Sequence, residues 1–269
     1  MKNTDIIAND WNAGSDRYFA ENASEAIIDK IASDPMWAFP EEMRVLLRAA
    51  FPDFRGKRVL VPSSGDNAAV FAFHLLGARV TSADIAERQL HNAGKIADAR
   101  GWSIDFVRDD SMKLARIESG AYDLVYTSNG VHVWIGDLPA MYRNFYRALK
   151  PGGQYVMFEV HPFNRPLTQD KDDLFRIASA KPYEATGPHF DIPNYHWRVQ
   201  DLFNAMAGAG FSIHKLIEFH SQTGCHDCWW YRDAREAEAD GNRLFDPTRN
   251  PFAALPQWIG FWAEKEGRE

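Results

Sequence analysis

Three loops in the middle of the chain carry side chains that could contact a ligand. The loop Pro62-Ser-Ser-Gly-Asp-Asn67 is small and contains a glycine, so a ligand could lie close to its backbone. Asp84 follows the next apolar run, and its carboxylate could accept hydrogen bonds from both hydroxyls of a ribose. Asp110 follows a third apolar run and could hold an adenine amino group, with Met112 covering the ring. Together these residue types favour the binding of a nucleoside.

Each of these loops also has a purely structural interpretation. The first could be a simple strand-to-helix turn, since a dinucleotide-binding loop of the G-x-G-x-x-G type would have several glycines and this loop has one. Asp84 could cap the N-terminus of a helix that begins at Ile85. Asp109 and Asp110 could form a solvated turn.

Two histidines follow later apolar runs, where they could meet the reacting group of a ligand. His132 lies in the loop 128–134 beside Trp134, and His161 follows the next run near Phe163. An imidazole with an ordinary pKa near 6.5 can act as a general base at neutral pH, although a lone histidine often serves only packing. We predict that His132 and His161 are the catalytic candidates.

The elements between these loops must bring them together. Apolar runs alternate regularly with helical stretches between Arg58 and Val160. Parallel strands need crossover connections, so this order predicts a parallel sheet with helices on both faces. Ligands of such sheets bind beyond the carboxyl ends of the strands, which is where the loops lie. The predicted strands span 58–62, 79–83, 103–107, 121–127 and 154–160, and the predicted helices span 68–76, 85–99, 111–117 and 138–149.

The regions before and after this alternating block have a different residue pattern. Residues 1–55 read as helices and are expected to form an N-terminal lid, followed by a main domain over 56–269. Residues 161–198 are rich in proline, histidine and aromatic residues, which is typical of an irregular cap, and a second insertion is expected near 220–255. A helix over 200–209 and strands over 211–219 and 256–263 complete the prediction.

Composition restricts the class of protein. The chain has 269 residues, 45% of them hydrophobic and 25% charged, as in an ordinary globular protein. Its formal net charge of −7 does not favour binding to nucleic acid or to an anionic membrane. The polar N-terminus lacks the pattern of a signal peptide, and no apolar run approaches the roughly 18 residues of a membrane span. We therefore expect a cytoplasmic protein; the sequence does not indicate an oligomeric state.

Four segments in order resemble the class I S-adenosylmethionine-dependent methyltransferases. These are Val59-Leu-Val-Pro-Ser-Ser-Gly-Asp-Asn67, Val80-Thr-Ser-Ala-Asp84 with the six residues after it, Tyr122-Asp-Leu-Val-Tyr126 and Leu149-Lys-Pro-Gly-Gly153. The resemblance implies a Rossmann-like, seven-stranded, mostly parallel sheet whose last strand is antiparallel. One departure is that Pro62, Ser63, Ser64 and the single Gly65 replace an acidic residue and several glycines.

The resemblance also implies a cofactor, S-adenosylmethionine, with S-adenosylhomocysteine as product. Gly65 would then lie against the methionine part, Asp84 would bind the ribose, Asp110 or its neighbours would approach the adenine, and Asn129 would lie near the methionine end. Tyr18 resembles a tyrosine of a lead-in helix that closes over the cofactor. The expected cofactor-binding residues are Tyr18, Pro62, Ser63, Ser64, Gly65, Asn67, Asp84, Ile85, Asp110, Ser111, Met112, Asn129 and Gly130.

Aromatic residues around the same region are the candidates for substrate contact. They are Trp11, Trp134, Phe163, Tyr195 and His196. Cys225 and Cys228 have C-x-x-C spacing with His220 nearby, but a structural zinc site usually has four ligands, so we expect reduced structural thiols and no metal. The aromatic run 229–231 is expected to be core.

The leading hypothesis is transfer of a methyl group to a small-molecule acceptor through its oxygen, nitrogen or sulfur atom. Residues 128–131 do not match the Asn-Pro-Pro-Tyr type signature of amino-methylating nucleic-acid enzymes, and neither cysteine follows a proline as in the cytosine class. A peptide or protein acceptor stays open, as does a non-catalytic nucleotide-binding protein of the same fold. A nucleotide-binding oxidoreductase is disfavoured by the single glycine of the first loop.

Overall fold

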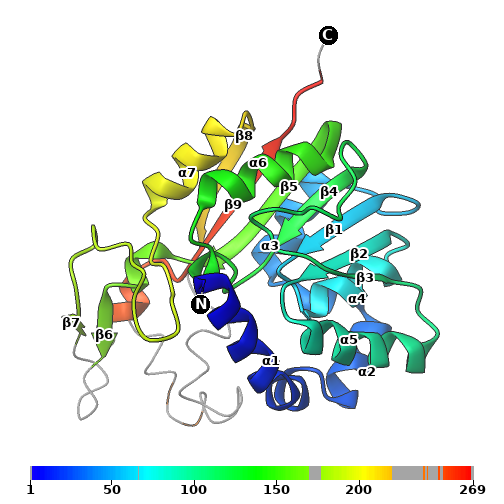
Figure 1. The fold of residues 1–269 in the computed structure, drawn as a ribbon, viewed down its shortest axis with the longest axis horizontal. Coiled ribbons are helices and arrows are strands. Elements are labelled where there is room, and N and C mark those ends of the chain that lie inside the picture. The colour runs from blue at the N-terminus through cyan, green and yellow to red at the C-terminus, as the bar shows by residue number, and fades with distance from the viewer. Residues whose placement is uncertain are drawn as a thin grey trace.

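The computed structural model describes residues 2–65, 67–169, 177–219 and 251–267, with residues 239, 241 and 248. A seven-stranded sheet in the order β3-β2-β1-β4-β5-β9-β8 runs through this part of the chain (Figure 1). Its strands are β1 (Arg58–Pro62), β2 (Arg79–Asp84), β3 (Asp105–Arg108), β4 (Tyr122–Thr127), β5 (Leu149–Val160), β8 (Ser212–Phe219) and β9 (Trp258–Glu264).

The direction of the strands agrees with the predicted fold. The pairs formed among β1, β2, β3, β4 and β5 are parallel. The last strand, β9, pairs antiparallel with both β5 and β8. The Rossmann-like sheet with an antiparallel last strand is therefore confirmed.

Helices cover both faces of the sheet and are α1 (Asn3–Asn22), α2 (Glu25–Ser33), α3 (Glu41–Ala50), α4 (Ala68–Leu75), α5 (Glu87–Arg100), α6 (Leu138–Ala148) and α7 (Val199–Gly208). Successive side chains of a strand point to opposite faces. Val59 and Val61 of β1 accordingly join a core with residues of α2, α3, α4 and α5, whereas Leu60 joins a core with residues of α6 and α7.

One predicted helix is wrong. Residues 111–117 form turns instead of a helix, and Leu114 has a φ of 44°. The Asp110 carboxylate accepts a hydrogen bond from the backbone N–H of Met112 at 2.9 Å, and Asp109 accepts one from Arg116 at 2.7 Å. Because these carboxylates satisfy backbone groups locally, they compete with helical hydrogen bonds.

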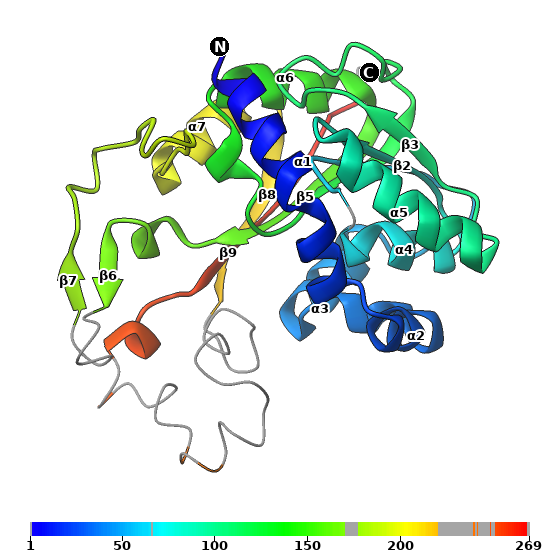
Figure 2. The same ribbon diagram turned by 60° about the horizontal axis from the view of Figure 1, so that its bottom comes forward.

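Helix α1 crosses in front of the sheet and docks on α5 (Figure 2). The Arg88 guanidinium pairs with Asp16 at 2.7 Å, and the Arg88 backbone N–H donates to Asn12 at 2.9 Å. The Asn92 side chain donates to the Ser15 hydroxyl at 3.1 Å. These contacts fix α1 over the carboxyl ends of the strands. The division into a lid (1–55) and a methyltransferase domain stays a prediction.

The segment 161–198 is mostly irregular, as predicted. It contains a short 3-10 helix (Pro162–Asn164) and a two-stranded sheet of β6 (Leu167–Gln169) and β7 (Ile177–Ser179). Most of the second insertion, 220–255, lies outside the described residues. No helix within the described ranges is long and apolar enough to cross a membrane.

Candidate functional site

A cavity lies between α1 and the carboxyl ends of the strands. The sequence had indicated most of its lining: every expected cofactor-binding residue lines the cavity except Pro62, the last residue of β1. The lining residues are Thr4, Ile7, Trp11, Tyr18, Ser63, Ser64, Gly65, Asn67, Asp84, Ile85, Gln89, Asp110, Ser111, Met112, Ser128, Asn129, Gly130, Val131, Trp134 and Ile135.

The loop after β1 brings backbone close to the cavity. Ser63 and Gly65 have φ values of 51° and 50°, a left-handed conformation that glycine adopts readily. A Cβ at position 65 would lie 2.9 Å from the Gln89 Oε1 atom. The Ser64 hydroxyl hydrogen-bonds the Ser82 hydroxyl at 2.8 Å, which ties the loop to β2. The loop is therefore built for close approach of a ligand.

Asp84 ends β2 and joins this loop to the start of α5. Its Oδ2 accepts the Gly65 N–H at 2.9 Å, and its Oδ1 accepts the Ala86 N–H at 2.7 Å. The helix itself begins at Glu87 with Ala86 as its N-cap, so Asp84 is not the cap residue. Burial raises the pKa of Asp84 to about 6, against the lowering effect of the backbone donors of Ala86, Gly65 and Ile85.

The turns after β3 supply the opposite wall. The Asp110 carboxylate pairs with the Lys113 ammonium at 2.9 Å and is mostly shielded from solvent. The Ser111 hydroxyl hydrogen-bonds the Ser63 hydroxyl at 2.7 Å, and Met112 lies at the same wall. The second and third strand-end loops thus face one cavity.

Three aromatic rings form a continuous wall. Trp11 packs edge-on against Tyr18 with ring centroids 5.7 Å apart and against Trp134 at 5.6 Å. Thr4 and Ile7 of α1 also line the cavity. Residues 4, 7, 11 and 18 share one helical face, and this periodicity could have identified Thr4 and Ile7 from sequence.

The other lining residues that the sequence analysis missed are Gln89, Ser128, Val131 and Ile135. Ser128, Val131 and Ile135 adjoin predicted residues in the loop after β4, and the Ser128 hydroxyl accepts a hydrogen bond from the Asn67 amide at 2.6 Å. Proximity to the strand end could have indicated these three. Gln89 had no comparable signal.

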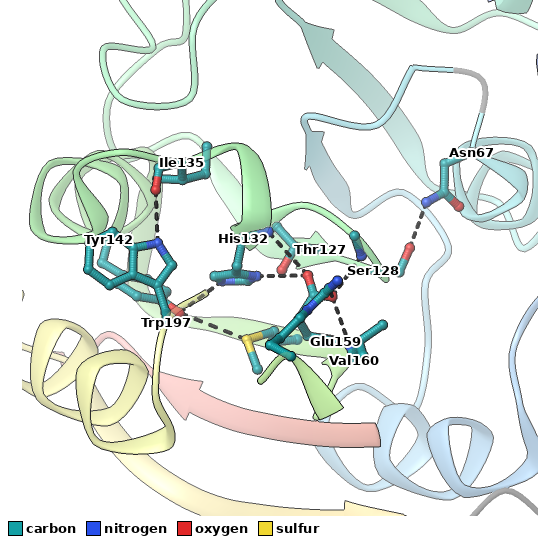
Figure 3. A network of polar contacts seen from close by, with 12 residues as sticks. Asn67, Thr127, Ser128, His132, Ile135, Tyr142, Glu159, Val160 and Trp197 are labelled. Carbon is teal, nitrogen blue, oxygen red and sulfur yellow. Dashed lines mark hydrogen bonds and ion pairs between the residues drawn. The ribbon is translucent and has the colours of Figure 1, made fainter. Parts of the chain in front are cut away.

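His132 is buried beside the cavity and is not one of its lining residues. Its Nδ1 lies 3.1 Å from Glu159 Oε2, and its Nε2 lies 3.0 Å from the Tyr142 hydroxyl (Figure 3). Burial alone would raise the pKa of Glu159, but the hydrogen bond and charge of His132 outweigh it, with Arg165 and Gly130 contributing, and hold that pKa at about 2. The catalytic role of His132 stays a prediction.

Glu159 also holds the loop after β4. Its Oε1 accepts the Gly130 N–H at 2.7 Å and the Val160 N–H at 2.8 Å, and its Oε2 accepts the His132 N–H at 3.1 Å. Gly130 has a φ of 88° and lines the cavity. The conformation of this part of the cavity wall therefore depends on one buried carboxylate.

His161 is likewise buried and away from the cavity lining. Its Nδ1 accepts the Phe163 N–H at 3.2 Å, which leaves Nε2 to donate to Glu218 at 2.9 Å. Burial lowers the pKa of His161, although Glu218 opposes this. Its catalytic role also stays a prediction.

The expected substrate residues fall into two groups. Trp11 and Trp134 line the cavity, whereas Phe163, Tyr195 and His196 belong to the segment 161–198 and do not. Tyr195 is buried, and its hydroxyl accepts a hydrogen bond from Asn3 of α1 at 3.0 Å. This contact joins the segment to the helix that covers the cavity.

Within the described ranges, no group of three or more histidine, cysteine, aspartate and glutamate side chains could hold a metal ion. Cys225, Cys228, His220 and the aromatic run 229–231 lie outside those ranges.

Known proteins provide an independent comparison. The family model described as a methyltransferase domain matches residues 62–153. A Bacillus subtilis (strain 168) protein named "Uncharacterized methyltransferase YbaJ" is 25% identical over 229 residues, covering 84% of each chain. The demethylmenaquinone methyltransferase of Thermus thermophilus is 33% identical over 108 residues, which cover 39% of this chain and 48% of that protein.

The fold has close counterparts among solved structures. An S-adenosylmethionine-dependent methyltransferase from Mesorhizobium loti aligns with a TM-score of 0.60 and 23% identity, covering 82% of this chain and 96% of that one. The matched domain contains the loops after β1, β2, β3 and β4 that form the cavity. Residues 62–153 thus match a methyltransferase domain, and the fold is that of S-adenosylmethionine-dependent methyltransferases, in agreement with the resemblance that the four strand-end segments had indicated.

Proposed function

We propose that the chain transfers a methyl group from S-adenosylmethionine to a small-molecule acceptor in the cavity under α1. The observation that carries this proposal is the composition of that cavity. The close backbone at Gly65 and the Asp84 carboxylate line one part, and the rings of Trp11, Tyr18 and Trp134 line another. The first part suits a nucleoside cofactor, and the second suits a small flat or apolar acceptor.

The residues present fit the cofactor. Asp84 lines the cavity, and its carboxylate oxygens could accept the ribose hydroxyls in addition to the backbone N–H groups of Gly65 and Ala86. A side chain at position 65 would meet Gln89, which is consistent with a cradle for the methionine part. Asp110 and Met112 would hold the adenine. Asn129 and Gly130 would lie at the methionine end.

The work of the protein in this reaction is binding and alignment. When bound, S-adenosylmethionine supplies a methyl group on a positively charged sulfur, which is already electrophilic. The aromatic wall of Trp11, Tyr18 and Trp134 would orient the acceptor and keep water away. No covalent nucleophile is needed from the chain.

His132 would act mainly by positioning. Both of its ring nitrogens are engaged inside the protein, and its partner Glu159 fixes the Gly130 backbone. His132 and Glu159 would therefore keep the loop after β4 in the conformation that lines the cavity. A direct role as general base would require His132 to exchange its bond to Tyr142 for one to the acceptor.

Binding and transfer experiments test the proposal. Calorimetry should give micromolar binding of S-adenosylhomocysteine and far weaker binding of NAD. With labelled S-adenosylmethionine and a cell extract split by a size filter, label should enter the small-molecule fraction. Trp11→Ala should reduce that transfer at least tenfold, whereas Trp37→Ala, an exposed tryptophan outside the cavity lining, should not. Label found only in proteins or peptides, or tight NAD binding without binding of S-adenosylhomocysteine, would overturn the proposal.

A further inference from the structure

Four basic side chains of the segment 161–198 lie outside the lining of the cavity. They are Arg165, Lys181, His189 and His196. The Lys181 ammonium lies 3.1 Å from His189 Nε2, and the rings of His189 and His196 have centroids 4.7 Å apart. The charges of Lys181, Arg165 and His189 all lower the pKa of His196, so the three side chains lie within electrostatic range of its ring.

Arg165 has unused hydrogen-bonding capacity. Its side chain is 25% exposed, and its nearest carboxylate oxygen, Glu159 Oε1, is 3.7 Å away, beyond hydrogen-bond distance. Among the residues that the structure describes, its guanidinium has no hydrogen-bond acceptor. Glu159 does not supply this acceptor, because its oxygens already accept hydrogen bonds from three backbone N–H groups and contact the His132 ring. A guanidinium with five donors in a largely enclosed place calls for an anionic acceptor.

The remaining members of the cluster have no carboxylate partner among the described residues. The Lys181 ammonium contacts the Ala185 carbonyl oxygen and His189, and it pairs with no carboxylate in the described part of the chain. His196 Nδ1 is buried with no hydrogen-bond partner there. Burial, together with the charges of Lys181, Arg165 and His189, lowers the pKa of His196 to about 3, so His196 is neutral at pH 7. Among the described residues, Glu159 is the one carboxylate that pairs with a member of this cluster.

Two acidic residues of the same segment that the structure describes, Glu184 and Asp191, are exposed, and neither forms an ion pair with any of the four members. Asp170, Asp172 and Asp173 lie outside the described residues. Glu218 is engaged with His161 at 2.9 Å. An anionic ligand would be attracted by the Arg165 guanidinium and the Lys181 ammonium.

The cluster adjoins the cavity through Glu159. Glu159 Oε1 lies 2.7 Å from the Gly130 backbone nitrogen, which belongs to the cavity wall, and 3.7 Å from the Arg165 guanidinium (Figure 3 shows Glu159 in this network). An acceptor molecule with its reacting atom in the cavity could thus reach the cluster with another group.

We propose that Arg165, Lys181, His189 and His196 bind an anionic group of the methyl acceptor, a carboxylate or a phosphate. This inference rests on the proposed function, since it names the chemical class of the small-molecule acceptor. Arg165 would supply a planar pair of donors, and Lys181 would supply a mobile charge. The neutral His196 would donate or accept a single hydrogen bond according to its tautomer.

Binding of simple anions tests the cluster directly. The full chain, saturated with S-adenosylhomocysteine, is titrated with inorganic phosphate and with benzoate in a calorimeter. Wild type should bind at least one of them saturably, and Arg165→Met and Lys181→Met should each weaken that binding at least tenfold. Arg143→Met, which removes an exposed positive charge on α6, should leave it within twofold of wild type. No saturable binding, or equal binding by wild type and both variants, would overturn the proposal.

A second measurement separates this inference from the proposed function. S-adenosylhomocysteine affinity is measured on the same samples, and Lys181→Met, which does not contact Glu159, should keep it within twofold of wild type. If wild type does not bind S-adenosylhomocysteine, the proposed function fails. If it binds S-adenosylhomocysteine but neither anion, only the anion site fails.

The product of the extract experiment distinguishes an acceptor-borne anion from free phosphate. Labelled product should be retained on an anion-exchange column at pH 7, and inorganic phosphate should inhibit its formation competitively. A labelled product that is not retained would refute an anionic acceptor, even if phosphate binds the cluster.

Discussion

Asp84 offers a test in which binding and stability should change in opposite directions. Its carboxylate is half-buried, and burial raises its pKa from 3.8 to about 6. If ribose hydroxyls donate to it, S-adenosylhomocysteine should prefer the ionised form. Affinity should then rise as pH increases through about 6, because a larger fraction of the protein is competent to bind.

The magnitude follows from the titration. With a pKa of about 6, roughly one tenth of Asp84 is ionised at pH 5 and roughly nine tenths at pH 7. If the protonated form binds poorly, the dissociation constant should be about tenfold larger at pH 5 than at pH 7. Asp84→Asn should abolish this dependence and weaken binding at pH 7 by about 1.5 to 3 kcal/mol, the usual scale for hydrogen bonds to a charged group.

Stability of the ligand-free protein should respond with the opposite sign. The raised pKa means that folding favours the protonated form, so the contribution of Asp84 to the free energy of unfolding falls as pH rises from about 4 to about 6. Above pH 6 the ionised group costs about 3 kcal/mol. Asp84→Asn removes that cost but loses one of the two backbone hydrogen bonds, worth about 1 kcal/mol. The variant should be about 2 kcal/mol more stable than wild type at pH 7.

The assay combines calorimetric titration with S-adenosylhomocysteine between pH 5 and 7 and denaturant unfolding over the same range. Asp110→Asn serves as the control for the pH dependence. Asp110 is the other carboxylate that lines the cavity, and its replacement should leave the tenfold change in affinity between pH 5 and 7 in place. The reasoning is refuted if Asp84→Asn binds S-adenosylhomocysteine as wild type does, or if it retains the tenfold pH dependence. A variant that loses stability without losing affinity would make Asp84 a structural residue of the loop.

Three further outcomes are expected. Gly65→Ala should lower the free energy of unfolding by about 1 to 2 kcal/mol, because its Cβ would meet Gln89 at a positive φ, and calorimetry should reveal weaker binding of S-adenosylhomocysteine. Glu159→Gln should cost about 3 to 5 kcal/mol of stability at pH 7 by breaking its buried pair with His132, and its difference from wild type in denaturant unfolding should narrow as pH falls from 4.5 toward 2. Trp134→Ala should raise KM for the acceptor while leaving the affinity for S-adenosylhomocysteine within about threefold; a reverse pattern would assign Trp134 to the cofactor.

Much of the fold could be predicted because its local signals agree with one another. The five parallel strands and three of the four helices expected between them follow from apolar runs separated by glycine and polar turns, whereas the antiparallel last strand was implied by the resemblance to the methyltransferases. The loops after β1, β2, β3 and β4 could be assigned to one cavity because strands of the same direction end at the same edge. The helix expected over 111–117 failed where two aspartates offered the backbone closer acceptors than a helix would.

The surroundings of the histidines could not be predicted in the same way. His132 and His161 do follow β4 and β5, but a strand end fixes the position of a Cα atom and leaves the direction of the ring open. Tyr142 and Glu218 hold the two rings from 10 and 57 residues away in the sequence, and neither spacing marks a partner. The cluster around His196 could not be predicted for the same reason. Its basic residues have no marked spacing within the irregular segment 161–198, and only the fold places them near one another. Sequence patterns therefore indicate the part of the site that is formed by the strand-end loops of the sheet. The part that would determine acceptor specificity depends on contacts between residues far apart in the sequence, which these patterns do not indicate.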